Sequence, residues 1–167
     1  QGGESPNNKL RVACISVGGK GESDSNAAAD GNDIVAIVDV DQARLDKAKQ
    51  KYTGAEAFTD YRKMFEVMGD KIDCVTVSTP DHTHFAIAMA AMERGLHVFV
   101  QKPLAHNIWQ VRTLRKAAKR YGVITQMGNQ GHTFEGMRRI KEWVAAGVIG
   151  DVTDVVTWTN RPNPPWF

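Results

Sequence analysis

The chain has 167 residues, of which 42% are hydrophobic and 24% are charged, and its formal net charge is +2. These values are ordinary for a globular domain, and the charge is too small to suggest a nucleic-acid partner. No apolar run approaches the roughly 20 residues that a membrane helix needs, so we expect no membrane association.

Residues 1–9 are polar and turn-forming, which predicts a flexible tail. They contain no signal peptide, but a signal removed earlier would leave no trace, so a cytoplasmic and an exported location both stay open. The two cysteines, Cys14 and Cys74, each lie inside an apolar, strand-like run. Such thiols behave as small hydrophobes, and their spacing predicts neither a disulfide framework nor a metal site.

Short apolar runs alternate along the chain with segments of helical composition. The runs predict strands at 10–17, 33–41, 55–60, 72–80, 97–103 and 123–128. The segments between and after them predict helices at 18–30, 42–52, 61–69, 84–95, 108–122 and 134–150. This alternation indicates an α/β fold with a doubly wound parallel sheet, whose ligands bind at the carboxyl ends of the strands.

The turn after the first strand contains Ser16, Gly18, Gly19 and Gly21. Ser16, Gly18 and Gly21 occupy the positions of the G-x-G-x-x-G motif of Rossmann dinucleotide-binding domains. Gly18 would let the backbone approach a pyrophosphate, and Gly21 would let the helix pack close to the strand. Ser16 replaces the first glycine, so we expect a weakened or distorted turn. The alternative is an ordinary strand–helix turn.

Asp39 ends the second strand about 18 residues after Gly21, where such domains place an acid that binds the adenosine ribose. A carboxylate accepts hydrogen bonds from both ribose hydroxyls and repels a 2′-phosphate, so we favour NAD over NADP as the cofactor. The alternative is a solvated residue at a strand end. Asp41 fits that description better, as the cap of the next helix.

The stretch "STPDHTHFAIAMAAMERGLHVFVQKPL", residues 78–104, resembles the core of the Gfo/Idh/MocA family, the glucose–fructose oxidoreductase and inositol dehydrogenase type. The resemblance covers essentially residues 9–150 and implies an NAD(P)-binding Rossmann domain over 10–150. It also implies a second, α+β substrate domain. Residues 151–167 resemble the first strand, at 152–160, and the following loop of that domain, whose remainder we expect this chain to lack. The chain alone should then bind dinucleotide at best.

The resemblance also implies roles for individual residues. Thr79 and Pro80 would line the nicotinamide side of the dinucleotide, His84 would lie close to the cofactor, and Asn129 would face nicotinamide or substrate. A metal site at His82 and His84 is disfavoured, because no third ligand of suitable spacing is present. His132, after the last strand, is a further candidate for the substrate side.

Lys102 would be the family's catalytic lysine, reaching the substrate hydroxyl and the nicotinamide ribose, with Pro103 fixing the turn that aims it. Gln101, which we also place at the cofactor, stands where the family most often has glutamate. Glutamine can hydrogen-bond through its amide but cannot carry a charge. The alternative for Lys102 is a solvated lysine at a strand end.

The family's usual reaction is hydride transfer between nicotinamide and a secondary alcohol of a sugar, sugar derivative or cyclitol, with the Lys102 ammonium stabilising charge on the oxygen. Two alternatives stay open: a glycoside hydrolase or lyase that uses NAD for transient oxidation, and a non-catalytic dinucleotide-binding module. We also expect a homo-oligomer, because the unpaired apolar strand at 152–160 favours self-association.

Overall fold

The computed structural model describes residues 9–158, apart from the side chains of His132 and Thr133. Residues 1–8 of the predicted tail therefore lie outside the described residues, as do residues 159–167. The side chain of His132, the candidate for the substrate side, also lies outside them. The chain divides into two compact units, one ending at Asn129 and the other beginning at Gln130. Each unit is described by itself.

A six-stranded parallel sheet forms the centre of the first unit, with the strand order β3-β2-β1-β4-β5-β6. The strands are β1 (Arg11–Ile15), β2 (Asp33–Val38), β3 (Glu56–Phe58), β4 (Cys74–Val77), β5 (His97–Gln101) and β6 (Thr125–Gly128). The order reverses between β1 and β4, which is the switch point where doubly wound sheets bind ligands. The predicted fold class is confirmed.

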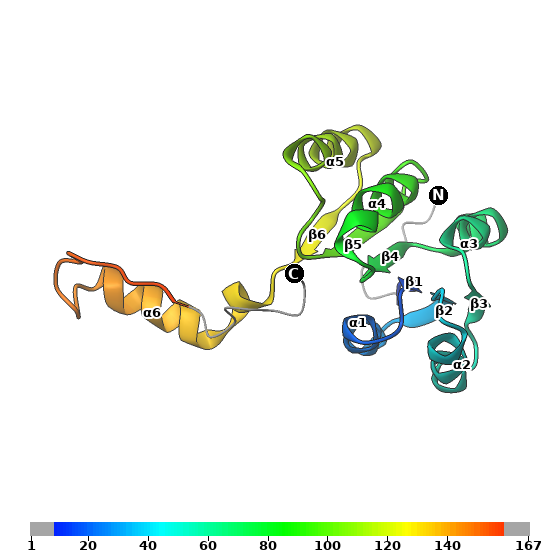
Figure 1. Cartoon of the computed structure of the whole chain (residues 1–167), viewed down its shortest axis with the longest axis horizontal. Coiled ribbons are helices and arrows are strands. Elements are labelled where there is room, and N and C mark those ends of the chain that lie inside the picture. The colour runs from blue at the N-terminus through cyan, green and yellow to red at the C-terminus, as the bar shows by residue number, and fades with distance from the viewer. Residues whose placement is uncertain (1–8, 159–167) are drawn as a thin grey trace. The chain divides into compact units, whose positions relative to one another are not determined.

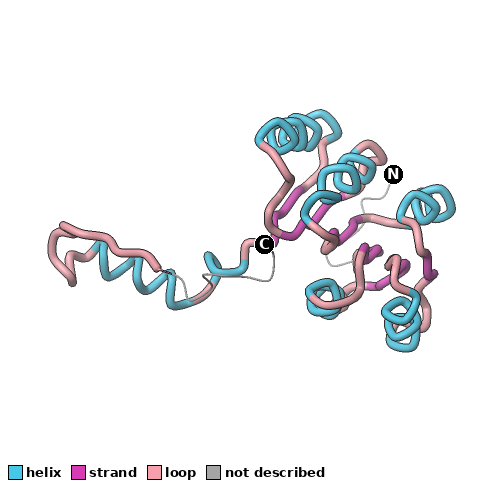
Figure 2. The backbone as a smooth tube through the Cα atoms, viewed as in Figure 1, coloured by secondary structure: helices cyan, strands magenta, loops and turns pink. Residues whose placement is uncertain are grey.

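Helices cover both sides of this sheet. In Figure 1, α3, α4 and α5 lie on one side and α1 and α2 on the other, and Figure 2 shows the strands between them. Their bounds are α1 (Lys20–Ala28), α2 (Gln42–Lys51), α3 (Tyr61–Met68), α4 (His84–Met92) and α5 (Ile108–Tyr121). The predicted cap is confirmed, because the Asp41 carboxylate accepts from the backbone N–H groups of Ala43 and Arg44 at the start of α2.

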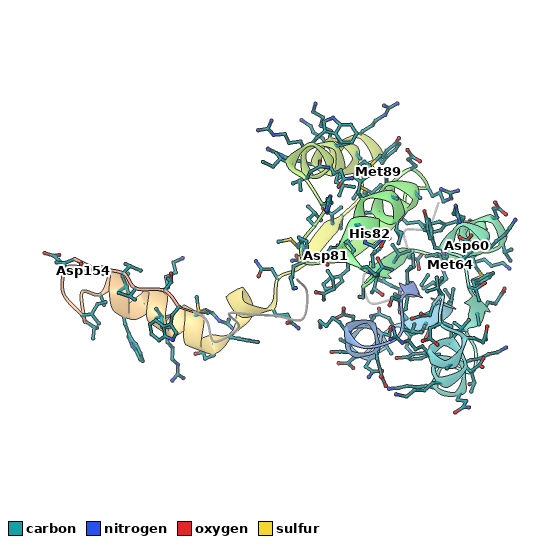
Figure 3. The ribbon with its side chains drawn as sticks, in the orientation of Figure 1. Asp60, Met64, Asp81, His82, Met89 and Asp154 are labelled. Carbon is teal, nitrogen blue, oxygen red and sulfur yellow. The ribbon has the colours of Figure 1, made fainter. Side chains whose placement is uncertain are left out.

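The core has two layers because alternate residues of each strand point to opposite faces. In β1, Ala13 and Ile15 belong to the layer under α3, α4 and α5, whereas Val12 and Cys14 belong to the other layer. Methionines fill gaps in the first layer. The core positions are Met64, Met68 and Met92, with Met89 partly buried (Met64 and Met89 are marked in Figure 3).

The second unit contains α6 (Glu135–Ala145), which is shorter than the helix predicted over 134–150. It ends before Gly147, whose φ of 68° lies in the left-handed region. The strand predicted over 152–160 does not form over 152–158, because no strand within residues 9–158 pairs with this segment. Its assignment to a second domain stays a prediction. None of the helices within residues 9–158 is both long and apolar enough to cross a membrane.

Both cysteines are free thiols on neighbouring strands, Cys14 on β1 and Cys74 on β4. Burial raises the pKa of the Cys14 thiol, and burial also raises the pKa of Cys74 to about 11.

Because the thiolate is the reactive form, we expect alkylation of Cys74 by iodoacetamide near pH 8 to be roughly 100-fold slower than that of a free cysteine. Mass spectrometry of timed samples measures this rate. The urea-unfolded chain is the control and should react at the ordinary rate, whereas equally fast alkylation of the folded chain would contradict the prediction.

Candidate dinucleotide site

The turn after β1 has the backbone path that a glycine motif requires, although its first glycine is replaced. Ser16 has a φ of 71°, the left-handed conformation that glycine adopts without cost and other residues adopt at roughly 1–2 kcal/mol. Its N–H donates to the carbonyl of Val38 at 2.8 Å, and the N–H of Gly21 donates to the carbonyl of Gly18 at 3.0 Å. The serine thus follows the path of the glycine it replaces.

Gly21 allows a close approach that no other residue would. A Cβ atom built on Gly21 would lie 2.1 Å from the carbonyl oxygen of Ser16, so the helix could not pack this near the strand. A Cβ on Gly18 would lie 2.3 Å from Cδ of Arg44, but this exposed side chain is flexible and can move aside, so the contact does not by itself require glycine. Gly19, by contrast, faces open space, with nothing within 4 Å of an added Cβ. The turn therefore leaves room beside the first N–H groups of α1, which have no partners inside the helix.

Asp39 follows β2 and is only 5% exposed. One carboxylate oxygen accepts from the N–H of Val17 at 3.0 Å, and the other accepts from the N–H of Asp41 at 3.0 Å. The interpretation of Asp39 as a solvated strand-end residue is therefore wrong. The Ser16 hydroxyl also donates, at 3.5 Å, to the oxygen that accepts from Val17. A carboxylate has about four acceptor sites, so this one keeps a site for a ribose hydroxyl.

A cavity of about 410 Å³ opens at the carboxyl ends of β1, β2 and β4. It brings together the glycine turn, the predicted acid and the residues after β4, through Ser16, Asp39, Thr79 and Pro80. Residues that no motif had indicated complete its wall, among them Val40, Arg44, Asp60, Tyr61 and Arg62.

The two arginines of the cavity each pair with a neighbouring carboxylate. Arg44 lies 3.4 Å from Asp41, and Arg62 lies 2.8 Å from Asp60. Hydrogen bonds with Arg62 lower the pKa of Asp60, which keeps this carboxylate ionised. The cavity thus holds a buried carboxylate together with arginines that already have anionic partners.

His84 connects the loops that follow β4 and β5. The ring is fully buried, with Nδ1 2.6 Å from the carbonyl oxygen of Pro103 and Nε2 2.8 Å from that of Thr79. Any contribution of His84 to cofactor binding therefore passes through these two residues. His82 is exposed in the short turn before α4 (Figure 3). No group of three His, Cys, Asp or Glu side chains within the described residues could hold a metal ion.

Lys102 and Asn129 follow the neighbouring strands β5 and β6, where Gln101 pairs with Gly128. Both residues are exposed at the same edge of the sheet. Among residues 9–158 no hydrogen bond or ion pair holds the Lys102 ammonium group. The strand order therefore places a free cation and an amide side by side, next to the loop that contains Thr79.

Gln101 is buried, and its amide Nε2 donates to the carboxylate of Asp24 on α1 at 2.9 Å. Sequence reasoning missed Asp24 and its second partner, Ser78, because neither belongs to a nucleotide-binding motif. The one available signal was Gln101 itself, because a buried glutamine amide needs a hydrogen-bond partner.

This fold and this turn define a Rossmann nucleotide-binding domain. A family model described as "Oxidoreductase family, NAD-binding Rossmann fold" matches residues 10–129. The chain belongs to the Gfo/Idh/MocA oxidoreductase family.

Three relatives illustrate the family. A glycosyl hydrolase family 109 protein of Solibacter usitatus is 33% identical over 89% of this chain and 36% of its own length. The myo-inositol 2-dehydrogenase of Thermotoga maritima is 27% identical over 93% of this chain and 47% of its own. The crystal structure of scyllo-inositol dehydrogenase from Lactobacillus casei, with bound NAD(H) and scyllo-inositol, matches with a TM-score of 0.77 and 25% identity over 87% of this chain and 44% of that one. The chain thus spans less than half the length of these relatives.

Proposed function

We propose that this chain provides the dinucleotide-binding domain of an NAD-dependent oxidoreductase that acts on a secondary alcohol of a sugar, sugar derivative or cyclitol. The observation that carries this proposal is the cavity that Ser16, Asp39, Thr79 and Pro80 share at the carboxyl edge of the sheet. The inositol dehydrogenases among its relatives support the substrate class.

The site offers suitable binding groups for both the adenosine half and the nicotinamide half of a dinucleotide. The open face at Gly19 and the first turn of α1 suit a pyrophosphate, and the Asp39 carboxylate suits the adenosine ribose. The edge formed by Thr79, Lys102 and Asn129 is left for the nicotinamide half and the substrate. When bound, the cofactor would supply the hydride acceptor.

Lys102 is the residue that we propose to act on the substrate. Its exposed ammonium group has no partner among residues 9–158, so it is available to donate to a substrate oxygen. A positive charge beside that oxygen stabilises the negative charge that develops as the hydroxyl proton leaves. The acid–base group that takes this proton would come from the second domain that the family resemblance implies.

Replacing Asp39 with asparagine should lower NADH affinity about tenfold and bring the affinities for NADH and NADPH close to each other. The reason is that the variant loses the carboxylate charge, which strengthens hydrogen bonds from the ribose hydroxyls of NADH and repels the 2′-phosphate of NADPH. Fluorescence titration with each nucleotide measures both affinities.

Asp46→Asn, an exposed change on α2 outside the cavity, is the matched control and should leave both affinities unchanged. If the unmodified chain bound NADPH as tightly as NADH, the role given to Asp39 would be wrong.

A second function is supported by the family 109 glycosyl hydrolase among the relatives. Such an enzyme would use NAD for transient oxidation and regenerate it within each turnover. The protein that carries this domain should be incubated with NAD, cyclitols and glycosides, while NADH absorbance and products are followed. NADH that accumulates in step with product supports the dehydrogenase, whereas product without NADH supports the hydrolase and overturns our first choice.

A further inference from the structure

The carboxylate of Asp24, in the middle of α1, is a shared acceptor for three different elements. It is 8% exposed. One oxygen accepts from the hydroxyl of Ser78 at 2.7 Å and from Nε2 of Gln101 at 2.9 Å. The other oxygen accepts from Nζ of Lys20 at 2.6 Å. A single side chain thus connects the first turn of α1 with the ends of β4 and β5.

The chemistry of this contact determines which residue position 101 can hold. An ionised carboxylate only accepts hydrogen bonds, so its partner must donate. Gln101 donates, and its side chain fills the space beside Gly128, where an added Cβ would lie 2.6 Å from the amide nitrogen. A glutamate at 101 would instead place a second buried acceptor charge against Asp24, which is unfavourable.

We propose that Asp24 is a positioning residue for the nicotinamide half of the cofactor. This inference rests on the proposed function. Ser78 and Gln101 precede Thr79 and Lys102 directly, and these are the two residues that we place beside the nicotinamide ring and the substrate. By holding both strand ends against α1, Asp24 sets the distance between the phosphate-binding turn and Lys102.

The test compares the affinities of the chain for NADH and for ADP-ribose, which lacks the nicotinamide ring, by isothermal titration calorimetry. A general loss of stability reduces the binding-competent fraction and lowers both affinities by the same factor. Loss of positioning lowers NADH affinity alone. We expect Asp24→Asn to reduce the ratio of NADH affinity to ADP-ribose affinity about fivefold, and an unchanged ratio would overturn the proposal.

An exchange of donor and acceptor sharpens the test. Gln101→Glu alone should reduce the ratio at least about tenfold, since two buried carboxylates would face each other. The double variant Asp24→Asn, Gln101→Glu should return to within about threefold of the unmodified ratio, because donor and acceptor are then interchanged. Losses that simply multiply in the double variant would show that the two residues act independently and would overturn the proposal.

Two further variants keep the result interpretable. Asp73→Asn removes a carboxylate that binds Arg11 at the opposite end of the sheet, so it should lower stability without changing the ratio. If Gln101→Glu does not fold, Gln101→Met removes the donor without adding charge and should lower the ratio about threefold.

Failure of the unmodified chain to bind either nucleotide would overturn the proposed function and this inference with it. Retained binding with an unchanged ratio would overturn this inference alone.

Discussion

Valine in place of Gly21 should abolish dinucleotide binding and destabilise the domain. The new Cβ would meet the carbonyl oxygen of Ser16, a backbone atom, at 2.1 Å, so α1 would have to move away from β1. Overpacking of this kind costs about 1–3 kcal/mol or more, which corresponds to a fall in Tm of several degrees. Displacing the helix also moves the N–H groups that would bind the pyrophosphate. We therefore expect NADH affinity to fall at least about 100-fold, as measured by titration alongside thermal unfolding.

The matched control is Gly54→Ala, since an added Cβ there has nothing within 4 Å and the backbone does not need glycine. This control should retain both Tm and NADH affinity. If Gly21→Val bound NADH as the unmodified chain does, the glycine turn would not be the phosphate site.

Alanine in place of Lys102 should reduce turnover by roughly 10²–10³-fold in the protein that carries this domain, the cost typical of removing a hydrogen-bond donor at a reacting oxygen. The side chain is exposed and has no partner among residues 9–158, so folding should be unaffected. NADH affinity should change by less than about threefold, so the loss would appear in kcat. Steady-state kinetics together with nucleotide titration measures both effects.

Lys116→Ala, an exposed lysine on α5, is the control and should have full activity. Lys102→Arg keeps the charge but changes the geometry of the donor and should restore only part of the rate. Unchanged turnover in Lys102→Ala would remove the catalytic assignment and return this lysine to a solvated strand-end residue.

The sequence was sufficient to predict most of the fold. Strands that are buried on both faces, such as β1 and β4, appear as continuous apolar runs, and their alternation with helices predicts a parallel sheet. Helix ends were predictable where a local cap exists, as at Asp41 and at Gly122, whose φ is 66°. The strand expected at 152–160 does not form over 152–158, because a strand needs a partner and its own residues do not show whether one is present.

The site was predictable only in part. Motif spacing identified the glycine turn and Asp39, which the structure brings to one cavity together with Thr79 and Pro80. The left-handed Ser16 was not predictable, because its conformation is imposed by pairing with β2 and by the close approach of Gly21. The carbonyl partners of His84 and the contact between Gln101 and Asp24 join residues from separate elements, so only the folded chain shows them.

The most direct test of the account is to map NADH binding on the isotopically labelled chain by amide NMR. We predict that the largest shift changes occur at residues 16–21, at Asp39 and at residues 79 and 102, and that NADPH produces weaker ones at the same concentration. Shift changes confined to another edge of the sheet, or no shift changes at saturating NADH, would contradict the assignment of the cavity at the carboxyl ends of β1, β2 and β4 as a dinucleotide site.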